Sequence, residues 1–175
     1  MRASIERCRM KTRAQFAVEY TFVIAILFVL LIPGIFLYYN YSTQSLKEIT
    51  SSKISGIGNS IVNNAENSFY LGRGSRVTLD INMPTGVLVG APDSGGSRID
   101  CSDVYCEIVF ALDGSEAVFS TDVTIIRWID DGSGNPKLPD AITQAERYFT
   151  EPEVSPGNKR VVIQTYTDFV TIDIE

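Results

Sequence analysis

The stretch KTRAQFAVEYTFVIAILFVLLIPGIFLYY, from Lys11 to Tyr39, decides the fold of this chain. Its last twenty residues, Tyr20 to Tyr39, contain no charged side chain. Twenty helical residues extend about 30 Å, which matches the hydrocarbon thickness of a bilayer. A buried core helix is the alternative, but such uniformly apolar core helices usually stop at about 10–14 residues. The stretch therefore predicts a membrane-spanning helix.

Charge is distributed unevenly on the two sides of this stretch. The first fourteen residues hold five basic side chains and one acidic one, whereas the whole 175-residue chain has a net charge of −6. Basic flanks stay on the cytoplasmic side of a membrane, so we expect the N-terminus inside and the acidic remainder outside. The acidic balance also argues against a nucleic-acid partner, because binding to phosphates needs clustered Lys and Arg.

Cysteine and histidine usage limits the chemistry of the chain. Cys8 falls on the reducing side, while Cys101 and Cys106 fall outside, where a disulfide persists. A four-residue connection between two strands would place Cys101 opposite Cys106, so we predict a disulfide; two free thiols or a metal pair are the alternatives. Histidine is absent, which argues against zinc and removes the commonest general base. No nucleotide-binding loop or nucleophile motif is present, so we expect no cofactor and no enzymatic activity.

The sequence divides into a leader, a helix and a β-rich domain. Residues 1–14 form the basic leader, residues 15–71 one long helix, and residues 75–175 the β-rich domain. Within the helix, residues 20–39 are apolar all round and residues 40–71 are amphipathic. Apolar side chains in the amphipathic half recur mostly every three or four residues, which predicts one buried helix face. They are Leu46, Ile49, Ile54, Ile57, Ile61, Ala65 and Phe69.

From Arg76 onward the sequence is typical of strands. RVTLDINM (76–83) alternates apolar and polar residues, and RIDCSDVYCEIVFAL (98–112) predicts a hairpin. EAVFSTDVTIIRWID (116–130) favours strands with a break near Ser120, and residues 159–175 favour one long strand or a final hairpin. Residues 138–150 predict a short helix. We therefore expect an α+β fold, with a long N-terminal transmembrane α-helix followed by an antiparallel β-sandwich.

The N-terminus also carries a candidate processing site. The leader ends in Ala14, and Gln15 precedes Glu19 at the start of the apolar run. A secretory signal peptide has its small-residue cleavage site after the apolar run, whereas this candidate site precedes it. RAQFAVEY resembles the class III signal peptide of archaeal type IV pilin-like proteins, whose pattern is basic, small, then Gln-x-Ser-x-Glu-Tyr before an apolar helix. The match departs from that pattern at Ala17, where Ser is usual, and at Ala14, where Gly is common; the resemblance covers residues 11–40.

This resemblance implies a structural subunit, a pilin or pseudopilin. A membrane-embedded prepilin peptidase would cleave between Ala14 and Gln15. An assembly ATPase and a platform membrane protein would then draw subunits from membrane lipid into a filament of copies of this chain or other pilins. In that filament Glu19 would contact the new N-terminal amine of Gln15 in a neighbouring subunit, unless Gln15 cyclises. The alternative functions are a solitary membrane-anchored binding module with an uncleaved signal anchor and a surface hydrolase that uses carboxylates.

Further features of the sequence have structural and functional alternatives. Pro33-Gly34 predicts a helix bend within the apolar run. Asn40 opens an Asn-Tyr-Ser sequon just outside the predicted span, so it is a candidate glycosylation site or a plain surface residue. The loop IDDGSGNP (129–136) offers oxygen ligands, although a polar turn is the simpler interpretation. We expect Trp128 in the core.

Overall fold

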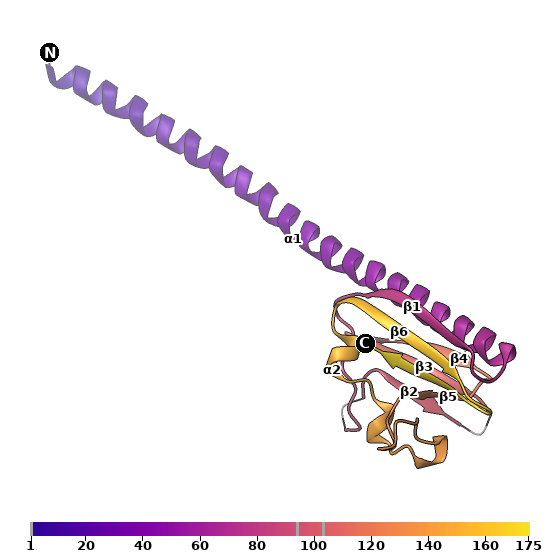
Figure 1. Ribbon diagram of the computed structural model, residues 1–175. Coiled ribbons are helices and arrows are strands. Elements are labelled where there is room, and N and C mark those ends of the chain that lie inside the picture. Colours follow the sequence, from indigo (N-terminus) through magenta and orange to yellow (C-terminus); the bar gives the residue numbers. More distant parts are fainter. Residues whose placement is uncertain (1, 94, 103) are drawn as a thin grey trace. The chain divides into compact units, whose positions relative to one another are not determined.

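The computed structural model describes residues 2–93, 95–102 and 104–175, and its side chains from Val18 onward. The chain forms two compact units, Met1–Lys47 and Glu48–Glu175. A long N-terminal helix is followed by two sheets with seven strands among the described residues (Figure 1). This arrangement confirms the predicted α+β fold.

Helix α1 extends over Arg2–Leu71. It begins before the expected residue 15, because the leader contains no Gly or Pro and is rich in Arg, Lys, Met and Ala, which favour helix. The helix continues through Pro33, so the bend at Pro33-Gly34 stays a prediction. It ends as expected before Gly72, whose φ of +98° lies in the left-handed region that glycine adopts at helix C-termini.

The strands form a four-stranded sheet in the order β1-β6-β7-β5 and a three-stranded sheet in the order β2-β3-β4. Their bounds are β1 Arg76–Met83, β2 Arg98–Cys101, β3 Cys106–Leu112, β4 Ser115–Thr121, β5 Ile125–Arg127, β6 Gly157–Thr165 and β7 Val170–Ile174. The predicted hairpin β2–β3 and the break between β4 and β5 are confirmed, and of the two arrangements expected near the C-terminus, one long strand or a hairpin, the structure has the hairpin β6–β7.

One strand pair departs from the expected antiparallel pattern, because β5 and β7 are parallel. The chain leaves β5, returns through β6, and reverses again in a hairpin before it enters β7. Strand β7 therefore runs in the same direction as β5. The other described strand pairs are antiparallel as predicted, so only this pair departs from the predicted antiparallel sandwich.

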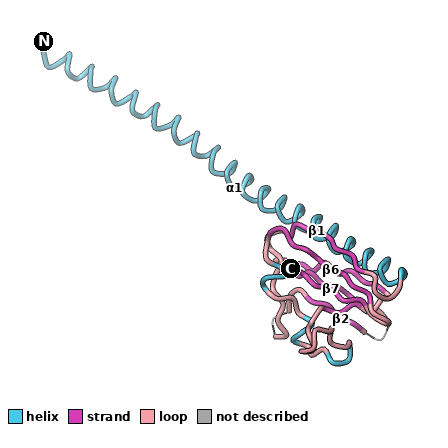
Figure 2. Tube along the Cα trace, in the orientation of Figure 1, coloured by secondary structure: helices cyan, strands magenta, loops and turns pink. Residues whose placement is uncertain are grey.

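The connection between β5 and β6 is mostly loop, interrupted by short helical turns (Figure 2). It holds two 3-10 turns, η1 at Pro139–Ala141 and η2 at Ala145–Arg147, and one helical turn, α2 at Glu151–Val154. The single short helix predicted over residues 138–150 is therefore wrong. Ile142 is extended and separates η1 from η2, and helices this short lack the length to propagate cooperatively.

One core joins the second half of α1 to both sheets. Ile54, Ile61 and Ala65 are at most 1% exposed and belong to the same apolar cluster as the inward side chains of β3, β6 and β7. Leu46 and Ile49, expected on the same buried face, are instead 62% and 50% exposed. The packed part of α1 therefore begins only at Ile54. Trp128, expected in the core, is only half-buried.

Candidate functional site

The largest apolar surface of the molecule lies on the first half of α1. Every residue from Val18 to Tyr39 is exposed, with Phe22 at 68% and Leu30 at 71%. No residue of the most apolar 18-residue window is buried, and the helix is long and apolar enough to cross a membrane. Monomeric soluble proteins rarely leave so large an apolar patch in water. This surface therefore requires lipid or another protein chain around it.

Tyrosines flank the apolar surface at both ends. Tyr20 lies at its start, and Tyr38, Tyr39 and Tyr41 lie at its end; all four are more than 65% exposed. Along the helix Tyr20 and Tyr38 are about 27 Å apart, close to the hydrocarbon thickness of a bilayer. Tyrosine is enriched at both membrane–water interfaces, so the positions of these tyrosines agree with a helix that is able to cross a membrane. These tyrosines can be read from the sequence, but an analysis of hydropathy alone does not single them out.

The predicted processing and assembly residues lie at the N-terminal edge of this surface. The backbone of Ala14 and Gln15 is part of α1, while their side chains lie outside the described part of the chain. Glu19 is exposed and pairs with no described side chain. The structure thus leaves the Glu19 carboxylate available to another molecule, one helical turn from Gln15.

Two other predicted positions lie on the same helix. A Cβ atom at Gly34 would meet nothing within 4 Å, so no described neighbour packs against that side of the helix. Asn40 is exposed one residue past Tyr39, and its carbonyl oxygen accepts a hydrogen bond from Thr43 Oγ1 at 2.9 Å. Glycosylation of Asn40 stays a prediction.

The predicted disulfide is confirmed. Cys101 and Cys106 are directly opposite each other across β2 and β3, with their Cα atoms 4.0 Å apart, and the two sulfurs are bonded. The backbone N–H of Ile125 in β5 points at Cys106 Sγ from 3.4 Å. The disulfide therefore closes the β2–β3 hairpin at the place where β5 lies against it.

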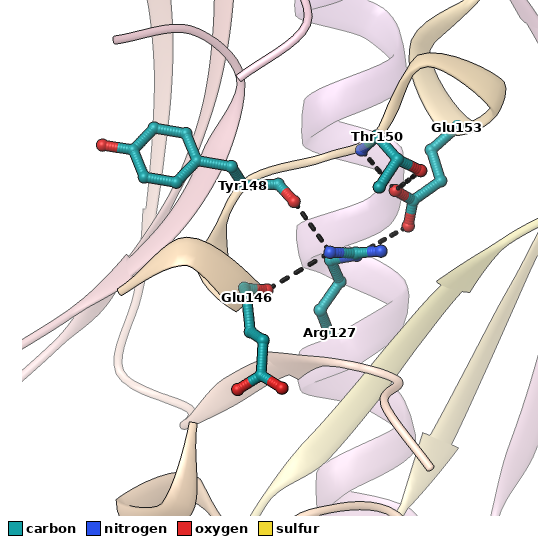
Figure 3. Close-up of polar contacts among 5 residues, drawn as sticks. All are labelled: Arg127, Glu146, Tyr148, Thr150 and Glu153. Atoms are coloured by element: carbon teal, nitrogen blue, oxygen red, sulfur yellow. Dashed lines mark hydrogen bonds and ion pairs between the residues drawn. The ribbon is translucent and has the colours of Figure 1, made fainter. Parts of the chain in front are cut away.

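A largely buried polar cluster centres on Arg127 of β5 (Figure 3). Its Nε donates to Glu153 Oε1 at 2.7 Å, and its guanidinium also donates to the carbonyl oxygens of Tyr148 and Glu146. The Glu153 carboxylate in turn accepts hydrogen bonds from the backbone N–H and the hydroxyl of Thr150, and the bond from the backbone N–H is one half of the capping box of α2. The contacts of Arg127 join β5 to the loop that follows it, and those between Thr150 and Glu153 lie within that loop. The cluster therefore holds that loop in place. The Glu153 carboxylate is already paired with Arg127 and Thr150.

The acidic glycine loop is a self-contained polar turn. Asp130 Oδ1 accepts the backbone N–H groups of Gly132 and Gly134, each at 2.8 Å. Asp131 Oδ1 accepts those of Ser133 and Asn135. The bonds from Gly134 and Gly132 hold the pKa of Asp130 below its usual value. Both carboxylates thus serve the turn itself, in agreement with the simpler interpretation.

Comparison with known proteins adds no relative. No protein-family model, no characterised protein and no solved structure matches the chain. The functional assignment therefore depends on the exposed apolar helix, on Glu19 at its edge and on the resemblance of the residues around them.

Proposed function

We propose that the chain is a structural subunit, a pilin or pseudopilin, of an archaeal type IV pilus-like surface filament. The observation that carries this proposal is the apolar surface from Val18 to Tyr39, in which every residue is exposed, with Glu19 at its edge. A helix that is apolar all round suits both lipid and a bundle of similar helices. Assembly can then exchange lipid contacts for helix contacts without exposing apolar surface to water.

Before assembly the subunit is a single-pass membrane protein. The basic leader keeps the N-terminus in the cytoplasm, and the domain that contains the disulfide lies outside the cell. Its partners are membrane lipid, prepilin peptidase, the assembly ATPase and its platform membrane protein, and other copies of the chain. In the filament the helices form the core and the domains the outside.

Glu19 is the specific contact in this proposal. A charged carboxylate inside hydrocarbon costs at least about 2–3 kcal/mol on insertion scales. Cleavage after Ala14 would create an α-amine on Gln15, and α-amines are normally protonated at neutral pH. Pairing Glu19 with that amine in a neighbouring subunit offsets the cost and fixes the stagger, because any other stagger leaves a charge unpaired.

The test is the N-terminus of the native protein. We expect intact-mass analysis of protein purified from its own membranes to give a chain that starts at Gln15, either free or cyclised. An Ala14→Phe variant should keep its leader and form no filaments. A native chain that still carries the leader would overturn the proposal.

That last result would instead favour the alternative function, a solitary membrane-anchored binding module with an uncleaved signal anchor. The two functions also differ in assembly, because the module would stay monomeric in the membrane while the pilin-like subunit would appear in surface filaments by electron microscopy.

A further inference from the structure

The two sulfurs of the disulfide have different access to solvent. Cys106 is 2% exposed, whereas Cys101 is partly exposed and lines an open pocket of about 710 Å³. Pockets that hold small molecules typically measure about 300–1,000 Å³, so this one has room for a small ligand. Cys106 is not among the residues that line it. A thiol that enters the pocket therefore reaches the sulfur of Cys101 and not that of Cys106.

Both sulfurs lie against the backbone of Ile125 in β5. The pairing of β5 with β7 uses the neighbouring residue, because the N–H of Val170 donates to the carbonyl oxygen of Thr124. The N–H of Ile125 instead points at Cys106 Sγ from 3.4 Å, and its carbonyl oxygen lies 3.2 Å from Cys101 Sγ. The exposed sulfur thus faces an acceptor, and the buried sulfur faces a donor.

This arrangement determines which sulfur is the better leaving group. Thiol–disulfide exchange proceeds by attack of a thiolate on one sulfur, and the other sulfur leaves as a thiolate. A donor aimed at the leaving sulfur stabilises its negative charge, because hydrogen bonds to charged groups are strong. Cys106 has such a donor in the N–H of Ile125, and Cys101 has only the carbonyl oxygen, which is an acceptor. The geometry therefore favours attack at Cys101 and departure of Cys106.

The charge of the pocket indicates the kind of thiol that enters it. Asp140 and Asp168 line the pocket, are exposed, and pair with no described side chain. Arg147 lines it too, but its guanidinium pairs with Asp100 at 3.1 Å, which offsets its charge. The two unpaired carboxylates leave the pocket negative, so it attracts cations and repels anions. A thiol that carries an ammonium group suits this pocket better than one that carries a second negative group.

We propose that the Cys101–Cys106 disulfide is an exchange site for a small cationic thiol. The thiolate of that molecule attacks Cys101 Sγ and forms a new S–S bond, while the bond to Cys106 breaks and its electron pair stays on Cys106. The Cys106 thiolate attacks Cys101 in the reverse step, expels the small thiolate and restores the disulfide. Each step exchanges one disulfide for another, so no oxidant or reductant is consumed. This inference does not depend on the proposed function, because it uses only residues of the β-rich domain.

The first test identifies the sulfur that is attacked. The full-length chain with Cys8→Ser, which removes the other thiol, is incubated in detergent with cysteamine and then alkylated with excess N-ethylmaleimide in urea. Peptide mass spectrometry should find cysteamine on Cys101 and the alkyl group on Cys106, with at least about ten such chains for each chain of the reverse pattern. Equal modification of the two cysteines, or exchange only in chains unfolded by urea beforehand, would overturn the inference.

The second test measures the preference for a cationic thiol. At equal thiolate concentration and low salt, cysteamine should react about tenfold faster than 2-mercaptoethanesulfonate, after both rates are divided by those of the urea-unfolded chain. Asp140→Asn with Asp168→Asn should bring this ratio close to one. The matched control, Asp80→Asn with Asp93→Asn, changes two exposed carboxylates outside the pocket and should keep the ratio of the wild type. A ratio close to one in the folded wild-type chain, or the same ratio in both double variants, would overturn the assignment of a cationic thiol.

Discussion

At the scale of single residues, two glycines in α1 have opposite surroundings. A Cβ atom at Gly58 would lie 2.2–2.4 Å from three ring atoms of Phe119 in β4, whereas a Cβ atom at Gly56 would meet nothing within 4 Å. The Phe119 ring also contacts Phe110, with ring centroids 6.3 Å apart. Gly58 is therefore required for α1 to approach β4, and Gly56 is not.

Alanine substitutions at the two positions should change stability in opposite directions. Gly56→Ala should raise the free energy of unfolding by about 0.5–1 kcal/mol, the difference in helix propensity between Gly and Ala. Gly58→Ala should lower it, because the Phe119 ring has to move out of a packed site. Thermal unfolding of the full chain in detergent measures both. Phe119→Leu combined with Gly58→Ala should recover part of the loss, and equal stability of the two single variants would contradict this account.

The sequence does not distinguish these glycines. Both interrupt the same amphipathic pattern, and the contact that separates them is made with a residue 61 positions further along the chain. The exposure of Leu46 and Ile49 escaped prediction for a related reason. Periodicity shows which side chains share a helix face, but it does not show where along that face the domain begins.

At the scale of elements, the C-terminal end of α1 is tied to β6 by a buried pair of hydroxyls. Ser68 Oγ and Thr165 Oγ1 are 2.7 Å apart, and the two residues are 0% and 1% exposed. Each hydroxyl needs the other, because a buried polar group without a partner carries its full cost of desolvation.

Removing one hydroxyl should therefore destabilise the domain more than removing both. We expect Ser68→Ala to lower the free energy of unfolding by about 1–3 kcal/mol, and Ser68→Ala with Thr165→Val to recover most of it. Urea denaturation of both variants measures the difference. A double variant that loses the sum of the two single effects would show that the pair has no coupling.

The loop after β5 contains a carboxylate whose titration can be followed. Glu146 pairs with Lys137 and also accepts hydrogen bonds from the backbone and hydroxyl of Thr143. These contacts, with Lys137 the largest, lower the pKa of Glu146 to about 2. A carboxylate with a lowered pKa stabilises the folded loop fully above its unfolded pKa of about 4.3, and that contribution is lost as the pH falls towards 2.

Amide exchange of residues 137–147 should consequently stay slow at pH 4, after correction for intrinsic rates, and become fast near pH 2. Carbon-detected NMR of the Glu146 carboxyl should show the titration directly. Lys137→Met should move the midpoint up towards the usual value for glutamate. A wild-type midpoint already at that value would contradict the ion pair.

Local patterns account for most of the elements, and non-local pairing accounts for the rest. Hairpin β2–β3 and the break between β4 and β5 are visible in the sequence because turn residues lie beside the strands they join, whereas residues 159–175 are compatible with one long strand or a hairpin. The parallel pairing of β5 with β7 is not visible, because it depends on the route of residues 128–156. The two 3-10 turns likewise depend on contacts such as those of Arg127 with the Glu146 and Tyr148 carbonyls.

At the scale of the whole molecule, the proposed assembly depends on the charge of Glu19. Glu19→Gln and Glu19→Ala should both leave leader cleavage and membrane insertion intact, because the basic leader and the apolar run are unchanged. Both should abolish filaments if Glu19 pairs with the amine of Gln15, since neither variant carries the negative charge. Immunoblotting for the leader and electron microscopy for filaments score the two steps separately.

The pattern of failure in these two variants defines the contact. Loss of filaments in Glu19→Ala alone would indicate a neutral hydrogen bond, as expected if Gln15 is cyclised. Normal filaments from Glu19→Ala would rule out an assembly role for the carboxylate. The candidate site itself was largely predictable, because Glu19 and the apolar run are adjacent in the sequence; what surrounds them in an assembly is not encoded in any local pattern.

The position of β7 has a consequence for when the domain can fold. Strand β7 follows every other described strand in the chain, yet it lies between β6 and β5 and is the only described strand with which β5 pairs. The four-stranded sheet therefore cannot close until residues 170–174 have left the ribosome. The β2–β3 hairpin needs only neighbouring residues, so its disulfide can form much earlier. The β2–β3 hairpin with its disulfide therefore does not depend on β7, whereas the pairing of β5 in the four-stranded sheet does.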